Sequence, residues 1–374
     1  MPPEAAKNEA YLVLEDGSVH RGYGFGAAGN AVGEVVFNTT MTGYQEVLTD
    51  PSYAGQLVTL TYPLVGNYGI NSIDFESRRI QVSGLIVREH CETPSHGASD
   101  RTIHQFLESQ GIPGVSGVDT RAITRRLRSQ GVMMGVITSD PDSALASLKS
   151  SPNYGELDHV RTVSTTEGYA WGDAGILSQP QNSTERPFRV LVTDCGLKYN
   201  ILRELNRRGC EVQVVPADTP AEELLSLKPS GVLLSPGPGD PQLLDYVVRN
   251  AREILGRTPV MGICLGHQIV ARALGAETFK LKFGHRGGNH PVRDLSTGRV
   301  YITAQNHGYA VRADSLPNGL EVSHMNLNDD TVEGLTHREL PVFTIQYHSE
   351  ASPGPRDNSY LFDRFLQMME DFGG

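Results

Sequence analysis

Residues 260–275, "VMGICLGHQIVARALG", place a cysteine between two glycines where an apolar run changes into a helical pattern. The apolar run is typical of a buried strand, and the segment after it is typical of an amphipathic helix that ends at glycine. The stretch therefore predicts a strand, a sharp turn at Cys264 and a helix. Gly262 and Gly266 flank this cysteine as glycines flank the serine of a G-x-S-x-G nucleophile elbow.

This turn gives Cys264 the surroundings of a nucleophile. The start of a helix carries a partial positive charge, which favours the reactive thiolate over the thiol. The backbone N–H of Leu265 would point toward a developing oxyanion. The alternative is a buried, inert cysteine, which is common in protein cores.

The same strand-then-helix pattern occurs four times after residue 187. Such a series predicts a doubly wound, mainly parallel sheet with helices on both faces, and ligands bind beyond the carboxyl ends of its strands. The predicted strands lie in "FRVLVTDCG" (188–196), "EVQVVPA" (211–217), "GVLLSPGPGD" (231–240) and "TPVMGICLG" (258–266).

A base for the cysteine is found near the end of the chain. His348 closes the strand-like run "VFTIQYHSE" (342–350), and Glu350 follows two residues later. Alternate residues of an extended segment face the same side, so the carboxylate can hold the imidazole in one orientation. Cys264, His348 and Glu350 thus form a candidate catalytic set. No HExxH, CxxC or other ligand spacing predicts a metal site.

The third predicted strand ends in a glycine-rich turn, "LSPGPGD" (234–240). Gly237 and Gly239 would let main-chain N–H groups approach a ligand closely, as a second oxyanion donor would. The alternative is an ordinary tight turn before a helix that starts at Pro241.

Composition excludes several classes of protein. The formal net charge of −11 disfavours binding to nucleic acid or to a membrane surface. The four cysteines are scattered and the N-terminus lacks a signal pattern, so we expect a cytoplasmic protein. The basic stretch "TRAITRRLRSQG" (120–131) predicts a helix, and we interpret its charges as a solvated face rather than a phosphate or partner site.

The first 149 residues predict a smaller domain of mixed α and β structure. Asp16-Gly17 between two short apolar runs indicates a hairpin, and "DRTIHQFLESQG" (100–111) indicates a helix. From residue 150 to 186 the periodicity fades and Gly, Ser, Thr and Pro accumulate, which is typical of a linker. Residues 187–374 form the second predicted domain.

"GICLGHQ" (262–268), "SPGPGDP" (235–241) and "QYHSE" (346–350) together resemble the class I glutamine amidotransferase domain. "LEDGSVHRGYGFG" (14–26), "TGYQEVLTDPSYAGQLVTLTYPLVGNYGI" (42–70) and "VLVTDCGLKYNILREL" (190–205) resemble the small, glutamine-hydrolysing chains of carbamoyl-phosphate synthases. The resemblance covers nearly the whole chain, including an N-terminal domain that other amidotransferases lack.

The resemblance implies a role for each matched residue. Cys264 would be the nucleophile, His348 the acid and base, and Glu350 the residue that orients it. Ser52 of "TDPSY" would reach the substrate from the N-terminal domain, which would also bind the partner. The other glutamine-binding residues implied are Gly237, Gly239, Leu265, Gln268, Asn306, Gly308 and Tyr309, the last at a position where the family often has phenylalanine.

The resemblance also implies a reaction and a partner. Glutamine would be hydrolysed through a γ-glutamyl thioester, and the ammonia would pass to a large synthetase chain that uses ATP, Mg²⁺ and bicarbonate. The product would feed arginine or pyrimidine biosynthesis, and this chain would need no cofactor of its own. Two alternatives stay open: an amidotransferase that serves another synthase, and a non-catalytic regulatory subunit.

Overall fold

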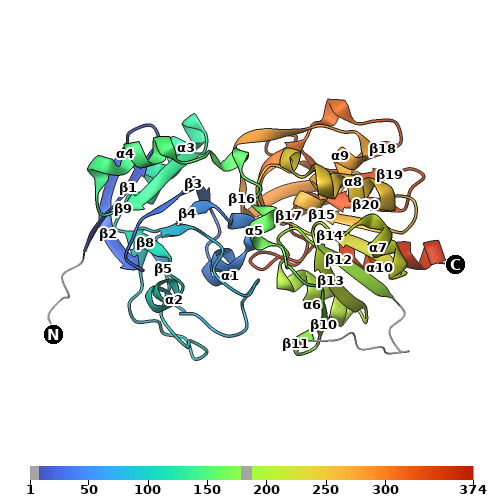
Figure 1. The fold of residues 1–374 in the computed structure, drawn as a ribbon, viewed down its shortest axis with the longest axis horizontal. Helices are drawn as coiled ribbons and strands as arrows, with labels where there is room; N and C mark the ends of the chain where they lie inside the picture. Colours follow the sequence, from blue (N-terminus) through green and yellow to red (C-terminus); the bar gives the residue numbers. More distant parts are fainter. Residues whose placement is uncertain (1–7, 178–187, 374) are drawn as a thin grey trace. The chain divides into compact units, whose positions relative to one another are not determined.

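The computed structural model describes residues 8–177 and 188–373, and the chain divides into two compact units, Met1–Leu157 and Asp158–Gly374 (Figure 1). The division falls within the segment that we expected to be a linker, and residues 178–186 of that segment lie outside the described residues.

The N-terminal unit contains a closed barrel of mixed parallel and antiparallel strands in the order β1-β2-β8-β6-β4-β3-β9. Its strands are β1 (Glu9–Leu14), β2 (Val19–Gly26), β3 (Ala31–Asn38), β4 (Gln56–Leu60), β6 (Gly84–Ile86), β8 (Pro113–Ser116) and β9 (Met133–Thr138). The short strands β5 (Leu64–Val65) and β7 (Glu89–His90) pair with each other. The helices are α1 (Tyr44–Thr49), η1 (Pro51–Tyr53), α2 (Ile103–Ser109), α3 (Thr120–Gln130), α4 (Pro141–Ser150) and η2 (Tyr154–Glu156).

Local chemistry explains several of these elements. Strands β1 and β2 form the expected hairpin, and Gly17 takes a positive φ of 86° at its turn. Helix α2 begins with a capping box between Thr102 and Gln105. The predicted basic helix is present as α3, and the side chain of Asp119 caps its N-terminus.

The second unit is built on an eleven-stranded sheet in the order β11-β10-β13-β12-β14-β15-β20-β19-β18-β16-β17. Its central strands are parallel: β13 (Glu211–Pro216), β12 (Arg189–Asp194), β14 (Gly231–Leu234), β15 (Val260–Ile263) and β20 (Val342–Ile345). The four predicted strand–helix units are present, with α6 (Tyr199–Arg207), α7 (Ala221–Ser226), α8 (Asp245–Ile254) and α9 (Leu265–Leu274) in the expected places. A 3-10 turn, η3 (Pro241–Leu243), precedes α8.

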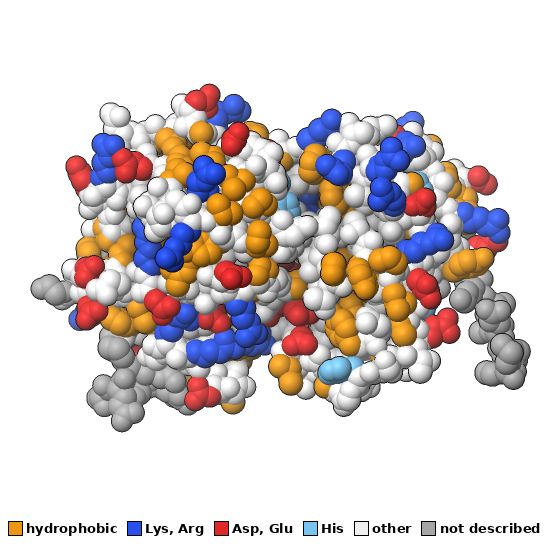
Figure 2. All heavy atoms as spheres, turned by 180° about the vertical axis from the view of Figure 1, so that it is seen from behind, with side chains coloured by type: hydrophobic (Ala, Val, Ile, Leu, Met, Phe, Trp, Pro, Cys, Tyr) orange, Lys and Arg blue, Asp and Glu red, His pale blue; other side chains and the backbone are white. Residues whose placement is uncertain are grey.

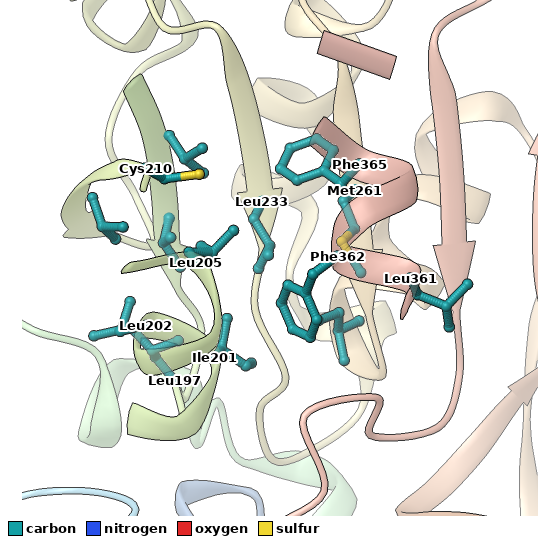
Figure 3. Packing of buried hydrophobic residues seen from close by; sticks show 14 of the residues in the cluster. Leu197, Ile201, Leu202, Leu205, Cys210, Leu233, Met261, Leu361, Phe362 and Phe365 are labelled. Carbon is teal, nitrogen blue, oxygen red and sulfur yellow. The ribbon is translucent and has the colours of Figure 1, made fainter. Parts of the chain in front are cut away.

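Helices cover both faces of this parallel block. Helix α6 and the C-terminal α10 (Tyr360–Gly373) pack on one face, where Ile201, Leu205, Phe362 and Phe365 are fully buried (Figure 3). Helices α7, α8 and α9 contribute apolar side chains to the core on the other face. Burying each such side chain contributes roughly 1.5–3 kcal/mol, so the two cores hold the strand ends in place.

Antiparallel strands extend the sheet beyond β20. They are β16 (Thr278–Asp294), β17 (Val300–Val311), β18 (Leu320–Asn326) and β19 (Val332–His337), with η4 (Ala313–Ser315) between β17 and β18. The pairing of β16 with β17 has two register shifts, and β17 also bridges to the segment after β20 through Ala304 and His348. These bends bring β17 to the carboxyl end of β15 and β20.

Part of the expected linker is structured. Residues 158–177 contain α5 (Val160–Val163), β10 (Tyr169–Gly172) and β11 (Gly175–Leu177), and β10 pairs with β13 at the edge of the sheet. Trp171 lies buried against the core of the second unit. A hairpin of such short strands leaves no long periodic pattern in the sequence, which explains why we read this segment as a linker.

Among the described residues, no helix is both long and apolar enough to span a membrane. On the face drawn in Figure 2, acidic and basic side chains are interspersed on both units.

Candidate active site

Cys264 lies where β15 ends and α9 begins. Its backbone has a φ of 54°, a conformation that a non-glycine residue adopts at a cost of about 1–3 kcal/mol. Its backbone N–H donates to the carbonyl of Ile345 on the neighbouring strand β20, at 2.8 Å. The side chain is 1 % exposed, with Sγ 3.6 Å from the carbonyl oxygen of Asn306. The predicted strand, turn and helix are thus present, with the strained turn of a nucleophile elbow.

The two flanking glycines are required by close backbone approaches. A Cβ atom on Gly266 would lie 2.0 Å from the carbonyl oxygen of Leu234 at the end of β14. A Cβ atom on Gly262 would lie 2.7 Å from the backbone of Gly266. No side chain fits at these distances, because the neighbouring atoms belong to the main chain and cannot rotate away.

His348 and Glu350 follow strand β20. Nδ1 of His348 and Oε1 of Glu350 are 2.7 Å apart, and both residues are almost fully buried. The backbone N–H of His348 donates to the carbonyl of Ala304 on β17, two residues before Asn306. The same stretch of β17 therefore touches both His348 and Cys264, while Nε2 of His348 has no hydrogen-bond partner among the described residues.

The charge of Glu350 controls the protonation of His348. Burial lowers the pKa of His348, and the positive charge of Lys198 lowers it further, but the adjacent carboxylate of Glu350 together with Cys264 raises that pKa to about 10. Burial would raise the pKa of Glu350, but the positive charges of Lys198 and His348 lower it to about 2. At neutral pH the pair therefore consists of an imidazolium and a carboxylate.

Lys198 is a member of the site that the sequence did not indicate. Its Nζ lies 3.1 Å from Oε1 of Glu350 and donates to the carbonyl of Ala351 at 2.6 Å, and its side chain is 2 % exposed. Asn200 donates to the backbone carbonyl of Glu350. Both residues belong to the turn after β12, at the N-terminal end of α6. The only sequence signal for Lys198 was the position of "GLKYN" (196–200) directly after a predicted strand. A buried lysine was not expected there, because lysine side chains are rarely buried.

The glycine-rich turn after β14 lies beside these strand ends. Gly239 has a positive φ of 92°. A Cβ on Gly237 would lie 2.0 Å from the carbonyl oxygen of Cys195 and 2.7 Å from the Leu265 side chain. The backbones of the turns after β12, β14 and β15 thus lie in close contact. This agrees with the prediction that the glycines of "LSPGPGD" permit a close approach of main-chain groups.

Five of the predicted glutamine-binding residues lie on α9 and β17. Gln268 is buried one turn beyond Cys264, and its Nε2 donates to the carbonyl of Tyr309 at 2.8 Å and to Oε1 of Gln346 at 3.0 Å. Asn306 contacts the cysteine sulfur through its carbonyl. The backbone of Gly308, between Asn306 and Tyr309, is partly exposed. Leu265, at the first position of α9, is buried against the glycine-rich turn.

Ser52 lies in η1 of the N-terminal unit. It is buried, and its Oγ has no hydrogen-bond partner among the described residues, although the side chain of Asp50 accepts from its backbone N–H. A contact between Ser52 and the substrate stays a prediction.

A second cluster of ionisable groups lies on β16, β17 and β19. His285, His307 and Glu333 are buried, with one possible ligand atom of each within 4.8 Å of the others. Residue types of this kind can hold Zn²⁺, which the sequence motifs did not indicate. In this structure these side chains take part in hydrogen bonds: Glu333 accepts from Gln305 and Asn326, and His285 pairs with the carboxylate of Asp329.

The other cysteines differ from Cys264. Cys195 and Cys210 are completely buried, and Cys91 is half-buried on the N-terminal unit. Burial raises the pKa of the Cys195 thiol, which makes it a poor nucleophile. Its complete burial fits a role in packing.

Comparisons with known proteins match both units. Residues 12–137 match the carbamoyl-phosphate synthase small chain, CPSase domain, and residues 191–368 match the glutamine amidotransferase class-I family. The chain is 53 % identical over 365 residues to a carbamoyl phosphate synthase small chain of Staphylococcus epidermidis, covering 97 % of this chain and 96 % of that one. It is 51 % identical over 361 residues to the carbamoyl phosphate synthase pyrimidine-specific small chain of Bacillus subtilis, covering 96 % and 95 %.

Proposed function

This chain belongs to the carbamoyl-phosphate synthase small-chain family, and on that premise we propose that it hydrolyses glutamine with Cys264, His348 and Glu350 and delivers the ammonia to a large synthetase chain. The observation that carries this proposal is the buried pair of His348 and Glu350 at 2.7 Å, beside a cysteine held at a strained strand-to-helix turn. This arrangement combines a nucleophile, a base and a group that orients the base.

The reaction begins at the sulfur. The Cys264 thiolate attacks the side-chain carboxamide carbon of glutamine, and the carbonyl oxygen becomes an oxyanion. Backbone N–H groups of Leu265 and Gly239 would stabilise that charge, each worth roughly 2.7–4 kcal/mol in comparable sites. The N-terminal end of α9 adds its positive dipole at the same place.

His348 then moves the protons. As an imidazolium it gives its Nε2 proton to the amide nitrogen, the C–N bond breaks, and ammonia leaves behind a γ-glutamyl thioester. The neutral imidazole next takes a proton from water, and the resulting hydroxide attacks the thioester carbonyl. The C–S bond breaks, glutamate is released, and the thiolate–imidazolium pair is restored.

The surrounding residues position these groups. Lys198 and Glu350 form a buried ion pair that keeps the carboxylate charged and aimed at Nδ1 of His348. Gln268, Asn306, Gly308 and Tyr309 would hold the amino-acid part of glutamine, with Gly237 behind the oxyanion donors. Ser52 would complete the site from the N-terminal unit.

The family assigns the remaining chemistry to a partner. Ammonia would pass to a large chain that uses ATP, Mg²⁺ and bicarbonate to make carbamoyl phosphate, and no cofactor is proposed for this chain. The match of residues 12–137 favours this function over service to another synthase. The complete triad favours it over a non-catalytic regulatory role.

Glutamate release from glutamine tests the triad. We expect Cys264→Ser and His348→Asn to lower this activity by at least about a hundredfold, while an exposed change, Lys282→Met, leaves it unaltered. Rapid acid quenching followed by mass spectrometry should detect a γ-glutamyl group on Cys264 of the unaltered chain. Full hydrolysis by the Cys264→Ser chain would contradict the proposal.

A further inference from the structure

Helix α3 carries a row of arginines on its exposed face. Arg121, Arg125 and Arg128 follow one another at intervals of four and three residues, and all three are exposed. Residues with this spacing lie above one another on one side of a helix. We call these three residues the arginine stripe.

The other side of α3 fixes this orientation. Ile123 and Leu127 are fully buried, and the helix packs against strands β3 and β4 of the barrel. The side chain of Asp119 caps the first turn at 2.9 Å from the N–H of Ala122. The buried side of α3 therefore faces the barrel, and the arginine stripe lies on its exposed side.

Helix α3 itself places no acidic side chain among the arginines of the stripe, whereas a solvated helix face usually does. Helix α3 contains no Asp or Glu, although the chain as a whole carries 43 acidic against 32 basic side chains. Arg126, off the stripe, pairs with Asp16. Within the part of the chain that the structure describes, Arg121 and Arg125 form no ion pair or hydrogen bond.

Such a row is unfavourable in the isolated chain. Like charges four residues apart on a helix repel each other by a few tenths of a kcal/mol. On the face drawn in Figure 2 acidic and basic side chains both occur, and the chain as a whole is acidic, whereas α3 carries arginines and no acidic side chain. An acidic surface that covers the stripe would remove the repulsion and add charge-assisted hydrogen bonds.

We propose that the arginine stripe is a docking surface for an acidic segment of the large synthetase chain. The inference rests on the proposed function, which supplies the large chain as partner. It replaces the interpretation of α3 as a merely solvated helix. Guanidinium groups bind carboxylates through two parallel hydrogen bonds, so a row of Asp and Glu side chains matches the stripe. Nucleic acid fits less well, because a net charge of −11 repels a long polyanion.

The test measures binding of this chain to the purified large chain at several salt concentrations. We expect the double change Arg121→Glu and Arg125→Glu to raise the Kd at least about tenfold and to flatten its salt dependence. Arg249→Glu is the matched control, because Arg249 is also an exposed helical arginine, on α8 of the other unit. This control should leave the Kd within about twofold.

Two readouts separate failure of this inference from failure of the proposed function. The double variant should keep its Tm and its glutamine hydrolysis in the absence of the large chain, and it should lose glutamine-driven carbamoyl phosphate synthesis. An unchanged Kd in the double variant would overturn the docking surface. The docking surface would also be overturned if the double variant lost self-association, measured by sedimentation, but still bound the large chain. An unaltered chain that fails to bind the large chain would instead overturn the proposed partner.

Discussion

Replacing Lys198 by methionine tests the electrostatic design of the site. Methionine keeps most of the apolar stem of lysine and removes its charge. The change leaves Glu350, which is fully buried, with His348 as its remaining charged partner. It also removes the hydrogen bond from Nζ to the carbonyl of Ala351.

The structure gives the size of the effect. Two unit charges 3.1 Å apart attract by roughly 5 kcal/mol at an effective dielectric constant of about 20. Removing one partner of a buried ion pair lowers the free energy of unfolding by about 3–5 kcal/mol. Because Glu350 keeps His348 as a charged partner, we expect a loss near the lower end, about 3 kcal/mol. Lys198 is the leading charge that lowers the pKa of Glu350, so its removal raises that pKa from about 2 toward the ordinary value.

The pH dependence follows from the direction of that shift. A lowered carboxylate pKa contributes stability that is present above about pH 4.5 and is lost as the pH falls toward 2. The difference in unfolding free energy between the unaltered chain and Lys198→Met should therefore be about 3 kcal/mol at pH 7 and shrink as the pH approaches 3. Urea unfolding measures it, with Lys282→Met as the exposed control. A loss below about 1 kcal/mol, or one that does not vary with pH, would refute this reasoning.

Three further changes test other parts of the site. Glu350→Gln removes the charge that raises the pKa of His348, so ¹⁵N NMR should show a neutral ring at pH 7 and glutamine hydrolysis should fall at least about a hundredfold; an imidazolium there would contradict the pairing. Gly266→Ala places a methyl group 2.0 Å from a backbone oxygen and should cost at least about 3 kcal/mol of unfolding free energy, whereas Gly97→Ala, in open space, should cost under about 0.5 kcal/mol; equal costs would disprove the steric argument. Iodoacetamide should leave Cys195 unmodified in the folded chain, and rapid labelling of that thiol, seen by mass spectrometry, would contradict its burial.

Much of the second unit followed from sequence periodicity. Each apolar run that ended in a turn and was followed by a helical pattern proved to be a parallel strand, because such strands are buried on both faces and their sequence shows it. The glycines at 262 and 266 predicted a sharp strand-to-helix turn at Cys264, and the structure gives the same reason, namely that the backbones lie too close together for side chains. The spacing of His348 and Glu350 predicted their contact correctly.

Other features depend on contacts that are distant in the sequence. The barrel of the N-terminal unit closes through pairings such as β1 with β9, which no local pattern reveals. Lys198 lies 152 positions before Glu350 and is buried only because the turn after β12 packs against the end of β20. The hairpin of β10 and β11 is too short for a periodic signal.

Transfer of amide nitrogen from glutamine to carbamoyl phosphate tests the central claim most directly. The chain would be mixed with a carbamoyl-phosphate synthase large chain, ATP, Mg²⁺, bicarbonate and amide-¹⁵N glutamine, with Cys264→Ser run in parallel. We predict ¹⁵N-labelled carbamoyl phosphate from the unaltered chain and none above background from the variant. Equal labelling by the two chains would contradict the role of Cys264, and labelled ammonia without labelled carbamoyl phosphate would contradict delivery to the large chain.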